Sequence, residues 1–421
     1  MKISDALNFE ILGVPIGDPI FCAKSIAEKR AHASKFWALL KEVGSVDSQV
    51  ALLLLRQCGG FCRMVHIARC TPPSVALEGL HLSDEEVRQT FSDSMCIDPS
   101  DSVWQQAQLS LSRGGLGLCS ASLHSSAAFM SSFSMSGFAT NTSHHLLQSL
   151  DHFNSPAEAI SIDELLNSPT TQKMLSTKIE NKQFQLLFDA SSIPNRARLN
   201  LHLDTAEFQT ALKWWLGIDM FGGTRCPSCS TQSLDPLGHH ALTCRYNGDV
   251  VSRDNQLRNT FFESCRQAGV GRQMEAGSGL GHDERRTRPA DVLVPNWDLG
   301  KPAAFDLTVA SPLNQSILNE ACVTAGSFAW VSEQRKHASN DVKCSELDWS
   351  CIPLAVETYG CWGAEARLHL SCLASHLAAR LNCSKSHATS TLYGRLNLVL
   401  VRANARALLS RAYGVGSNIP A

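Results

Sequence analysis

Two aspartates lie inside neighbouring apolar segments of the rear half of the chain. Asp291 begins the segment DVLV, and Asp306 stands in the middle of AAFDLTV. A buried carboxylate is costly unless it is paired, hydrogen-bonded or bound to a metal ion. Because the turn PNWDLGK joins the two segments, a hairpin would bring both carboxylates to the same end of a sheet. Two hard oxygen ligands suit magnesium, so we expect a Mg²⁺ site able to activate water for attack on a phosphodiester.

The helix expected after the second segment offers a cation to the same site. Its sequence SEQRKHASNDVKC places Lys336 and Lys343 two turns apart on one face. We predict that Lys336 is catalytic, orienting the water or stabilising the phosphate, with Lys343 as the second choice. Glu275, on the preceding segment, is a further candidate acid. The structural alternative is a solvated lysine face, with Asp306 paired to an arginine such as Arg288.

A cluster of cysteine and histidine residues precedes the aspartates. Cys226 and Cys229 are spaced C-x2-C, and Cys244 follows two adjacent histidines, all within nineteen residues. Nitrogen and sulfur ligands in this number suit tetrahedral zinc. We take His239 as the fourth ligand, which completes C-x2-C-x9-H-x4-C, while His240, one helical turn before Cys244, stays an alternative. A site with four protein ligands has no open position, so this zinc would be structural.

Hydrophobic periodicity predicts a helical front half and a rear half of helices and strands. Residues 1–130 carry apolar side chains at helical spacing, and Pro72 and Pro73 interrupt the pattern. We expect a new helix from Ser83, a serine followed by acids, and a second helical region over 155–218. Beyond it the sequence predicts a helix at 253–268, strands near 272–276, 290–295 and 303–309, a helix at 314–339, a strand at 351–357, a helix at 363–382 and a basic helix at 392–414.

The expected fold is therefore α+β with several domains. Composition is that of an ordinary globular chain, with 421 residues of which 44% are hydrophobic. The expected domains are a helical region over 1–130, a helical linker over 131–222, a zinc knuckle over 223–246, an α/β domain with a mixed sheet over 247–385 and a basic C-terminal helix over 386–421.

Composition also bounds the cellular setting. No apolar run approaches the roughly 20 residues that span a bilayer, and the start of the chain lacks the apolar stretch of a secretory signal. We therefore expect an intracellular protein without a membrane partner, whose 16 cysteines are mostly free thiols. The net charge of −2 gives no support of its own to nucleic-acid binding.

The order of motifs in the rear half resembles the C-terminal end of non-LTR retrotransposon polyproteins. The elements in question carry a restriction-like endonuclease of the PD-(D/E)XK class after the reverse transcriptase. The cysteine–histidine knuckle, RDNQLRNTFFESC, RPAD…AFDLTV and RKHASND follow one another as they do in that family. In the front half, NFEILGVPIG resembles the segment after the polymerase palm, and LLLLRQCGGFCRMVHIARCTPPS resembles the helical thumb.

The resemblance implies roles for particular residues. Arg253 and Asn255 match an Arg-His-Asn motif, and Asp291 and Asp306 match the two acids of the nuclease. In this group the catalytic lysine comes from the following helix, which is the place of Lys336. We further expect the knuckle and the arginines Arg285, Arg286 and Arg288 to contact the DNA backbone, and we count Arg253 and Asn255 of the matched motif as nucleic-acid-binding residues as well.

This chain departs from the family pattern at three places. Ala290 is inserted between Pro289 and Asp291, Asp254 replaces the histidine of the Arg-His-Asn motif, and Thr308 stands where a lysine usually follows the second acid. The alternative function is therefore a catalytically dead relic that binds nucleic acid through its zinc knuckle.

The resemblance also implies partners and a location. The nuclease would nick one strand of DNA, and in the parent element that nick primes reverse transcription. No Tyr-x-Asp-Asp motif or Asp-Asp pair occurs in the chain, so polymerisation, which needs paired carboxylates for two metal ions, is not expected. We expect DNA, element RNA and a palm-bearing reverse transcriptase as partners, in the nucleus, and a chain that is the C-terminal piece or a decayed copy of a longer reading frame.

Overall fold

A computed structural model describes residues 2–5, 8–135, 202–274, 290–298, 300–313 and 318–413. These residues form two compact units, one up to residue 135 and one from residue 202. Most of the predicted linker, residues 136–201, lies outside the described residues. Each unit is described by itself.

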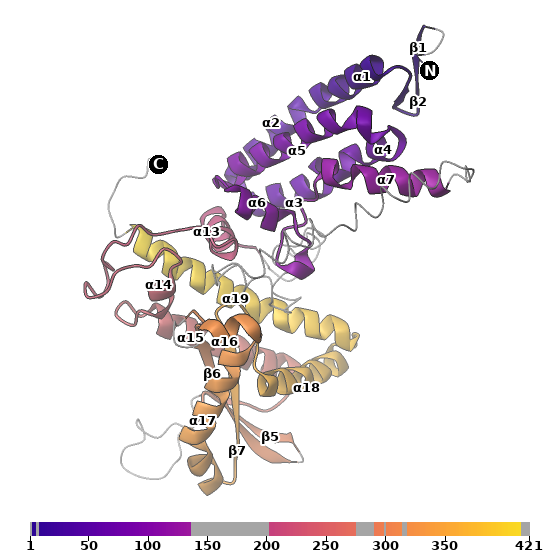
Figure 1. The fold of residues 1–421 in the computed structure, drawn as a ribbon. Coiled ribbons are helices and arrows are strands. Elements are labelled where there is room, and N and C mark those ends of the chain that lie inside the picture. Colours follow the sequence, from indigo (N-terminus) through magenta and orange to yellow (C-terminus); the bar gives the residue numbers. More distant parts are fainter. Residues whose placement is uncertain are drawn as a thin grey trace. The chain divides into compact units, whose positions relative to one another are not determined.

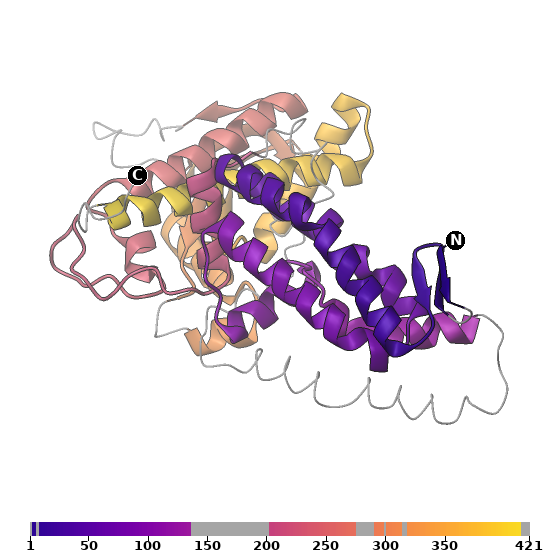
Figure 2. The same ribbon diagram turned by 90° about the horizontal axis from the view of Figure 1, so that it is seen from above.

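The first unit is mainly helical, as its periodicity predicts, and begins with a small antiparallel sheet in the order β1–β2–β3. Helices α1, α2 and α5 run side by side (Figures 1 and 2). Its elements are β1 (Lys2–Asp5), β2 (Asn8–Ile11), β3 (Val14–Ile16), α1 (Pro19–His32), α2 (Ser34–Val46), α3 (Ser48–Leu54), the π-helical turn η1 (Leu55–Gly59), α4 (Phe61–Cys70), α5 (Pro73–Met95), α6 (Asp101–Gln108), the 3-10 turn η2 (Leu111–Arg113) and α7 (Ala121–Met135).

Two helix boundaries in this unit test the sequence prediction. Pro72 precedes α5 and Pro73 is its first residue, because a proline at the first turn loses no helical hydrogen bond. The expected helix start at Ser83 is wrong. Ser83 is buried in the interior of α5, where its small side chain packs against neighbouring helices instead of capping an end.

The stretch Ser48–Cys70, which comprises α3, η1 and α4, is long and apolar enough to cross a membrane. Length and composition alone are weak evidence for a membrane span, because core helices of soluble proteins share both properties. Within the unit, Leu52 and Leu55 of this stretch are buried.

The second unit is built on a four-stranded mixed sheet in the order β4–β5–β6–β7. The first three strands pair antiparallel, while β6 and β7 are parallel and are joined by a helical crossover. The strands are β4 (Gln273–Met274), β5 (Val292–Asp298), β6 (Lys301–Ala310) and β7 (Ser350–Glu357). The expected mixture of helices and a mixed sheet is confirmed.

Helices cover both faces of this sheet. Helix α17 packs on one face, and α15 and α18 pack on the other, with α19 lying against α15 and α18 (Figure 1). The helices are α13 (Thr205–Trp215), α14 (His239–Thr243), α15 (Asp249–Ala268), α16 (Leu318–Val323), α17 (Ser327–Glu346), α18 (Ala364–Leu381) and α19 (Lys385–Tyr413).

The regions predicted as a knuckle, an α/β domain and a basic C-terminal helix fall within this one unit. Leu396 and Leu400 of α19 belong to the same hydrophobic core as Phe305 of β6. The C-terminal helix is thus a structural layer of the unit.

Alternation along β6 decides which side chains meet which helix. Phe305 and Leu307 lie in the core formed with α15 and α18, whereas Ala304 packs in a separate cluster with Cys344 of α17. Since successive residues of a strand point to opposite faces, Asp306 lies on the same face as Ala304. The catalytic candidate on β6 therefore faces α17.

Candidate active site and metal centres

Four side chains of the predicted knuckle form a tight cluster. The ligand atoms of Cys226, Cys229, His240 and Cys244 all lie within 4.8 Å of one another. The sulfurs of Cys226 and Cys244 are 3.9 Å apart, and Cys229 Sγ is 3.3 Å from His240 Nε2. Tetrahedral zinc with its usual bond lengths needs separations of about 3.8 Å and about 3.6 Å respectively. Hydrogen bonds from Thr231 lower the pKa of Cys229 to about 5, which favours the metal-binding thiolate.

The cluster can therefore hold a metal ion and is compatible with zinc, but its histidine differs from our first choice. The backbone N–H groups of His239 and His240 donate to the two carboxylate oxygens of Asp235, at 2.9 and 2.7 Å, which starts α14. Adjacent helical residues point in directions about 100° apart, so only one ring can face the cysteines. His239 Nδ1 instead lies 3.1 Å from Ser311 Oγ, and the assignment of His239 as a ligand is corrected to His240.

The C-terminal helix α19 packs against α14, the helix that carries His240. Gly238 has a φ of +77°, and a Cβ there would lie 2.4 Å from Leu408 of α19, so no side chain fits. The fully buried guanidinium of Arg411 donates to the carbonyl oxygen of Cys244 at 3.5 Å and pairs with Asp249. These contacts tie α19 to Cys244 and to the start of α15.

The two predicted acids lie together at the start of β5 and within β6. Asp291 Oδ2 accepts a hydrogen bond from the backbone N–H of Leu307 at 2.8 Å, next to Asp306 in the chain. Burial and the neighbouring carboxylate of Asp306 raise the pKa of Asp291 to about 6. Asp306 is itself only 8% exposed. The hairpin expected from the turn sequence therefore brings the acids side by side.

Helix α17 supplies two partners to Asp306. Lys336 Nζ donates to Oδ1 at 2.9 Å, and Asn340 Nδ2 donates to Oδ2 at 2.8 Å. Lys336 thus reaches the acids, as predicted, while Lys343 is exposed further along the helix. The sequence prediction missed Asn340, although its position one helical turn after Lys336 is a usable signal.

A third carboxylate reaches the site from α15. Asp254 interacts electrostatically with Lys336 and Asp306, and burial raises its pKa to about 6. Its Oδ1 atom is buried without a hydrogen-bond partner in the part of the chain that the structure describes. From the sequence, Asp254 was expected only to replace the histidine of the Arg-His-Asn motif, and it was not predicted as a site residue. Carboxylate oxygens such as those of Asp254, Asp291 and Asp306 are the donors that a hard cation, magnesium among them, prefers.

A polar cavity of about 620 Å³ opens beside these acids. Its walls come from α14, the end of β6 and α17, and they include Lys336 itself. Two further cations, Arg245 and Arg335, line it together with the hydroxyl groups of Thr308 and Ser311. We call it the cationic groove. Such a lining suits phosphate oxygens, which accept hydrogen bonds from guanidinium and hydroxyl groups.

The residues predicted to contact nucleic acid divide into three groups. Arg253 is 4% exposed and donates to the carbonyl oxygen of Leu242 and to Asn404 Oδ1. The prediction that it contacts nucleic acid is therefore wrong. Arg253 lies one helical turn before the buried Leu257, on the face of α15 that packs inward. Asn255 is exposed. Arg285, Arg286 and Arg288 lie outside the described residues, as does Glu275, the further candidate acid of the magnesium site.

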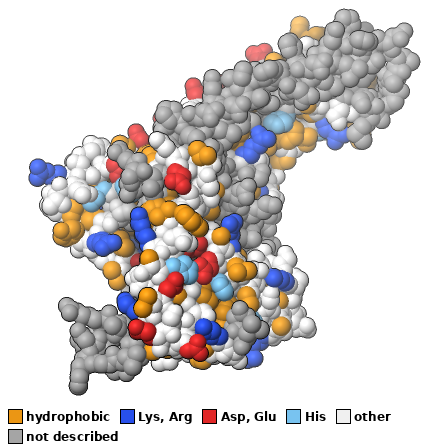
Figure 3. Space-filling model, turned by 60° about the horizontal axis from the view of Figure 1, so that its bottom comes forward, with side chains coloured by type: hydrophobic (Ala, Val, Ile, Leu, Met, Phe, Trp, Pro, Cys, Tyr) orange, Lys and Arg blue, Asp and Glu red, His pale blue; other side chains and the backbone are white. Residues whose placement is uncertain are grey.

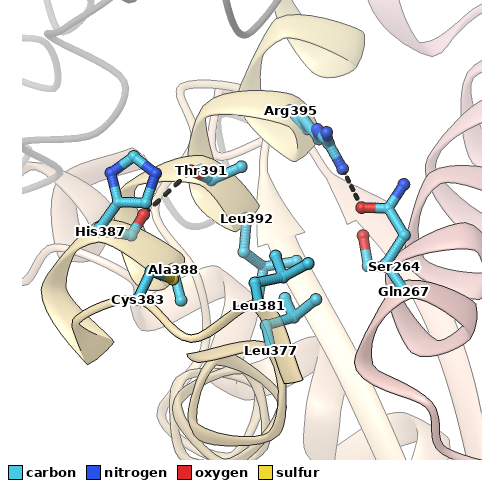
Figure 4. A pocket seen from close by; sticks show the side chains of 10 residues that line it. All are labelled: Ser264, Gln267, Leu377, Leu381, Cys383, His387, Ala388, Thr391, Leu392 and Arg395. Atoms are coloured by element: carbon cyan, nitrogen blue, oxygen red, sulfur yellow. Dashed lines mark hydrogen bonds between the residues drawn. The ribbon is translucent and has the colours of Figure 1, made fainter. Parts of the chain in front are cut away.

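A second cavity, of about 230 Å³, is lined by α15, α18 and residues from Cys383 to α19 (Figure 4). Leu377, Leu381 and Leu392 form much of its wall, and Arg395 donates to Gln267 beside it. Its lining residues include no carboxylate. The cationic groove likewise has no carboxylate in its lining, but its lining residue Lys336 donates to Asp306.

The sequence matches no protein-family model, and no curated protein is significantly similar to it. Its function is therefore inferred from the geometry of its own side chains.

Proposed function

We propose that the second unit is a metal-dependent endonuclease that hydrolyses a phosphodiester of DNA and nicks one strand. One observation carries this proposal: Lys336, which lines the cationic groove, donates to Asp306, and both Asp291 and Asp254 interact electrostatically with these two residues. Neighbouring buried acids with raised pKa values are typical of functional sites, because a fold gains no stability from holding them together unpaired.

In this proposal Asp291 and Asp306 hold magnesium, and Asp254 offers a further oxygen. Magnesium keeps several of its waters and takes one or two carboxylates from a protein. When bound, it would stabilise charge on the phosphate and lower the pKa of a water molecule. The hydrogen bond from Asn340 holds the Asp306 carboxylate in place for this task.

The protein's own groups account for the rest of the reaction. Hydrolysis joins a water oxygen to phosphorus and breaks the bond from phosphorus to the leaving sugar oxygen. Lys336 lines the groove and can donate to a phosphate oxygen or to the water. Asp254, with a pKa of about 6, is largely ionised at neutral pH and can accept the proton that the water loses.

The cationic groove would bind the DNA backbone. Arg245 and Arg335 would contact phosphates, which supplies affinity without choosing a base sequence. The overall charge of −2 does not oppose this, because a local groove attracts phosphates within a short screening distance. Binding of this kind weakens steeply as salt is raised.

We further propose that the knuckle holds a structural zinc ion through Cys226, Cys229, His240 and Cys244. Its helix α14 contributes to the groove wall, so the zinc would stabilise the DNA-binding surface. In an element of the kind that the motifs resemble, the nick would then prime reverse transcription by a separate palm-bearing polymerase.

The test is nicking of supercoiled plasmid by the full chain with magnesium. Asp291→Asn and Asp306→Asn should abolish nicking. Asp348→Asn is the matched control, because Asp348 is exposed and its left-handed backbone (φ 54°) suits asparagine. If both site variants nick as well as the parent chain, the site is wrong. Salt-dependent DNA binding by a parent chain that never nicks would instead support the catalytically dead relic.

A further inference from the structure

A second group of metal-ligand atoms lies in the same unit, contributed by α17 and β7. One ring nitrogen of His337, a carboxylate oxygen of Asp341 and the sulfur of Cys351 all lie within 4.8 Å of one another. His337 and Asp341 are one helical turn apart, and their Nδ1 and Oδ1 atoms are 2.8 Å apart. Figure 3 shows histidine and acidic side chains next to one another on the surface of the molecule.

A fourth donor adjoins this group. The thiol of Cys344, one further turn along α17, is in hydrogen-bonding contact with that of Cys351, which in turn contacts Asp341. Cys344 is buried, whereas Asp341 is exposed. One nitrogen, one oxygen and one sulfur therefore converge between α17 and β7, and the thiol of Cys344 contacts the sulfur of this group.

The other ring nitrogen of His337, Nε2, has a carboxylate partner that fixes the orientation of the ring. His337 Nε2 lies 2.7 Å from Glu365 Oε2 in the first turn of α18. Histidines that bind metals almost always donate their second ring N–H to a carboxylate or a carbonyl, which fixes the ring and leaves the first nitrogen free for the ion. Glu365 occupies that place.

We propose that His337, Asp341, Cys344 and Cys351 form a second zinc site that clamps α17 to β7. Zinc is the ion of choice because it accepts nitrogen, oxygen and thiolate ligands at tetrahedral positions. Cys344, whose thiol contacts that of Cys351, would complete a set of four ligands with no open position, so the ion would be structural. Lys336 is the neighbour of His337 in the chain, and the clamp would hold its helix against the sheet that carries Asp306.

Two simpler states compete with this site. In the first, His337 is only a bridge between the carboxylates of Asp341 and Glu365. In the second, Cys344 and Cys351 form a disulfide when the protein is oxidised. Neither state binds a metal ion, so metal content separates the proposed site from both of them. The proposal does not depend on nuclease activity, because its readout is bound zinc.

The experiment measures zinc by elemental analysis in the full chain, purified with a reductant and freed of loosely bound metal. We expect one zinc ion for each of the two clusters. Cys226→Ser should remove the knuckle ion, and His337→Gln or Cys351→Ser should remove the other. His81→Gln and Cys70→Ser, which change exposed residues of the first unit, are the matched controls.

A further variant tests the role of Glu365, the carboxylate that contacts His337 Nε2. Glu365→Gln should retain the site but weaken its zinc affinity by about 10- to 100-fold, as expected for a partner behind the ligand. A parent chain with a single zinc ion that disappears in Cys226→Ser overturns the second site, and this result needs no folded variant of the cluster. Two parent ions that both survive His337→Gln and Cys351→Ser overturn it as well.

Discussion

The knuckle and the acid cluster lie in the same unit but differ in how their donor atoms are satisfied. In the knuckle, Cys226, Cys229, His240 and Cys244 converge on one point, and the buried Arg411 closes it from behind. In the acid cluster, by contrast, Asp254 keeps a buried oxygen without a partner within the described residues.

The knuckle and the acid cluster also differ in their exposure to solvent. The knuckle sulfurs of Cys226 and Cys244 are buried, whereas Lys336 of the acid cluster lines an open groove. A closed set of four ligands stabilises a fold, and an open set of oxygens leaves positions for water and substrate. The comparison teaches that two clusters of donor side chains in one chain can be told apart by whether their donor atoms are already satisfied.

The largest expected effect is loss of the knuckle. His240→Ala should abolish its zinc and unfold the region around α14, because structural zinc contributes about 10–16 kcal/mol of binding free energy in zinc-finger peptides. His239→Ala is the matched control and should keep the zinc, since its ring contacts Ser311. Zinc content and circular dichroism check this. Loss of zinc from His239→Ala alone would reverse our correction.

The next effect concerns the open site. Lys336→Ala should lower the nicking rate by about 10²- to 10³-fold, the usual cost of removing one donor that stabilises charge in the transition state, without loss of zinc. Lys343→Ala, an exposed lysine on the same helix, should nick like the parent chain. Single-turnover nicking at saturating protein measures both. A greater loss with Lys343→Ala would show that the two lysines have been assigned the wrong way round.

A buried acid with satisfied oxygens should affect stability and leave catalysis unchanged. Glu357 accepts backbone hydrogen bonds from Phe328 and Ala329 at 3.0 and 3.3 Å, and burial raises its pKa from 4.5 to about 7. The folded chain therefore holds a proton that the unfolded chain releases, so stability falls as pH rises from about 4.5 to about 7. The loss is on the order of 3 kcal/mol.

Glu357→Gln should flatten this part of the pH dependence, because glutamine does not ionise, and should leave nicking unchanged. Asp254→Asn, at the acid with the unpartnered oxygen, should instead lower nicking. Urea unfolding at several pH values, followed by plasmid nicking, measures the pair. An equal effect of both variants on nicking would remove the distinction between satisfied and unsatisfied acids.

The smallest effect is expected in the cationic groove. Arg335→Ala should reduce the slope of log affinity against log salt by about 1, with a uniform loss across DNA sequences. Lys385→Ala removes one charge at an exposed position outside the groove and should leave the slope unchanged. Fluorescence anisotropy with labelled duplexes at several salt concentrations distinguishes the two variants.

Short-range patterns in the sequence determined much of the second unit. The short apolar run around Asp306 predicted β6, and the turn after β5 predicted the hairpin that joins the acids. The spacing of Cys226 and Cys229 predicted a knuckle, and helical spacing placed Lys336 on a helix after the sheet. Each of these inferences depends on residues close in sequence, whose geometry the backbone period sets.

Only the tertiary structure decided which side chains are desolvated and where they meet. Arg253 looked like a DNA contact but is buried against Asn404, about 150 positions away in the chain. Asp254 looked like a lost histidine but lies near Lys336. The choice of His240 over its neighbour follows from the direction in which α14 leaves its cap. Burial and electrostatic partnership arise between distant segments, and no local spacing encodes them.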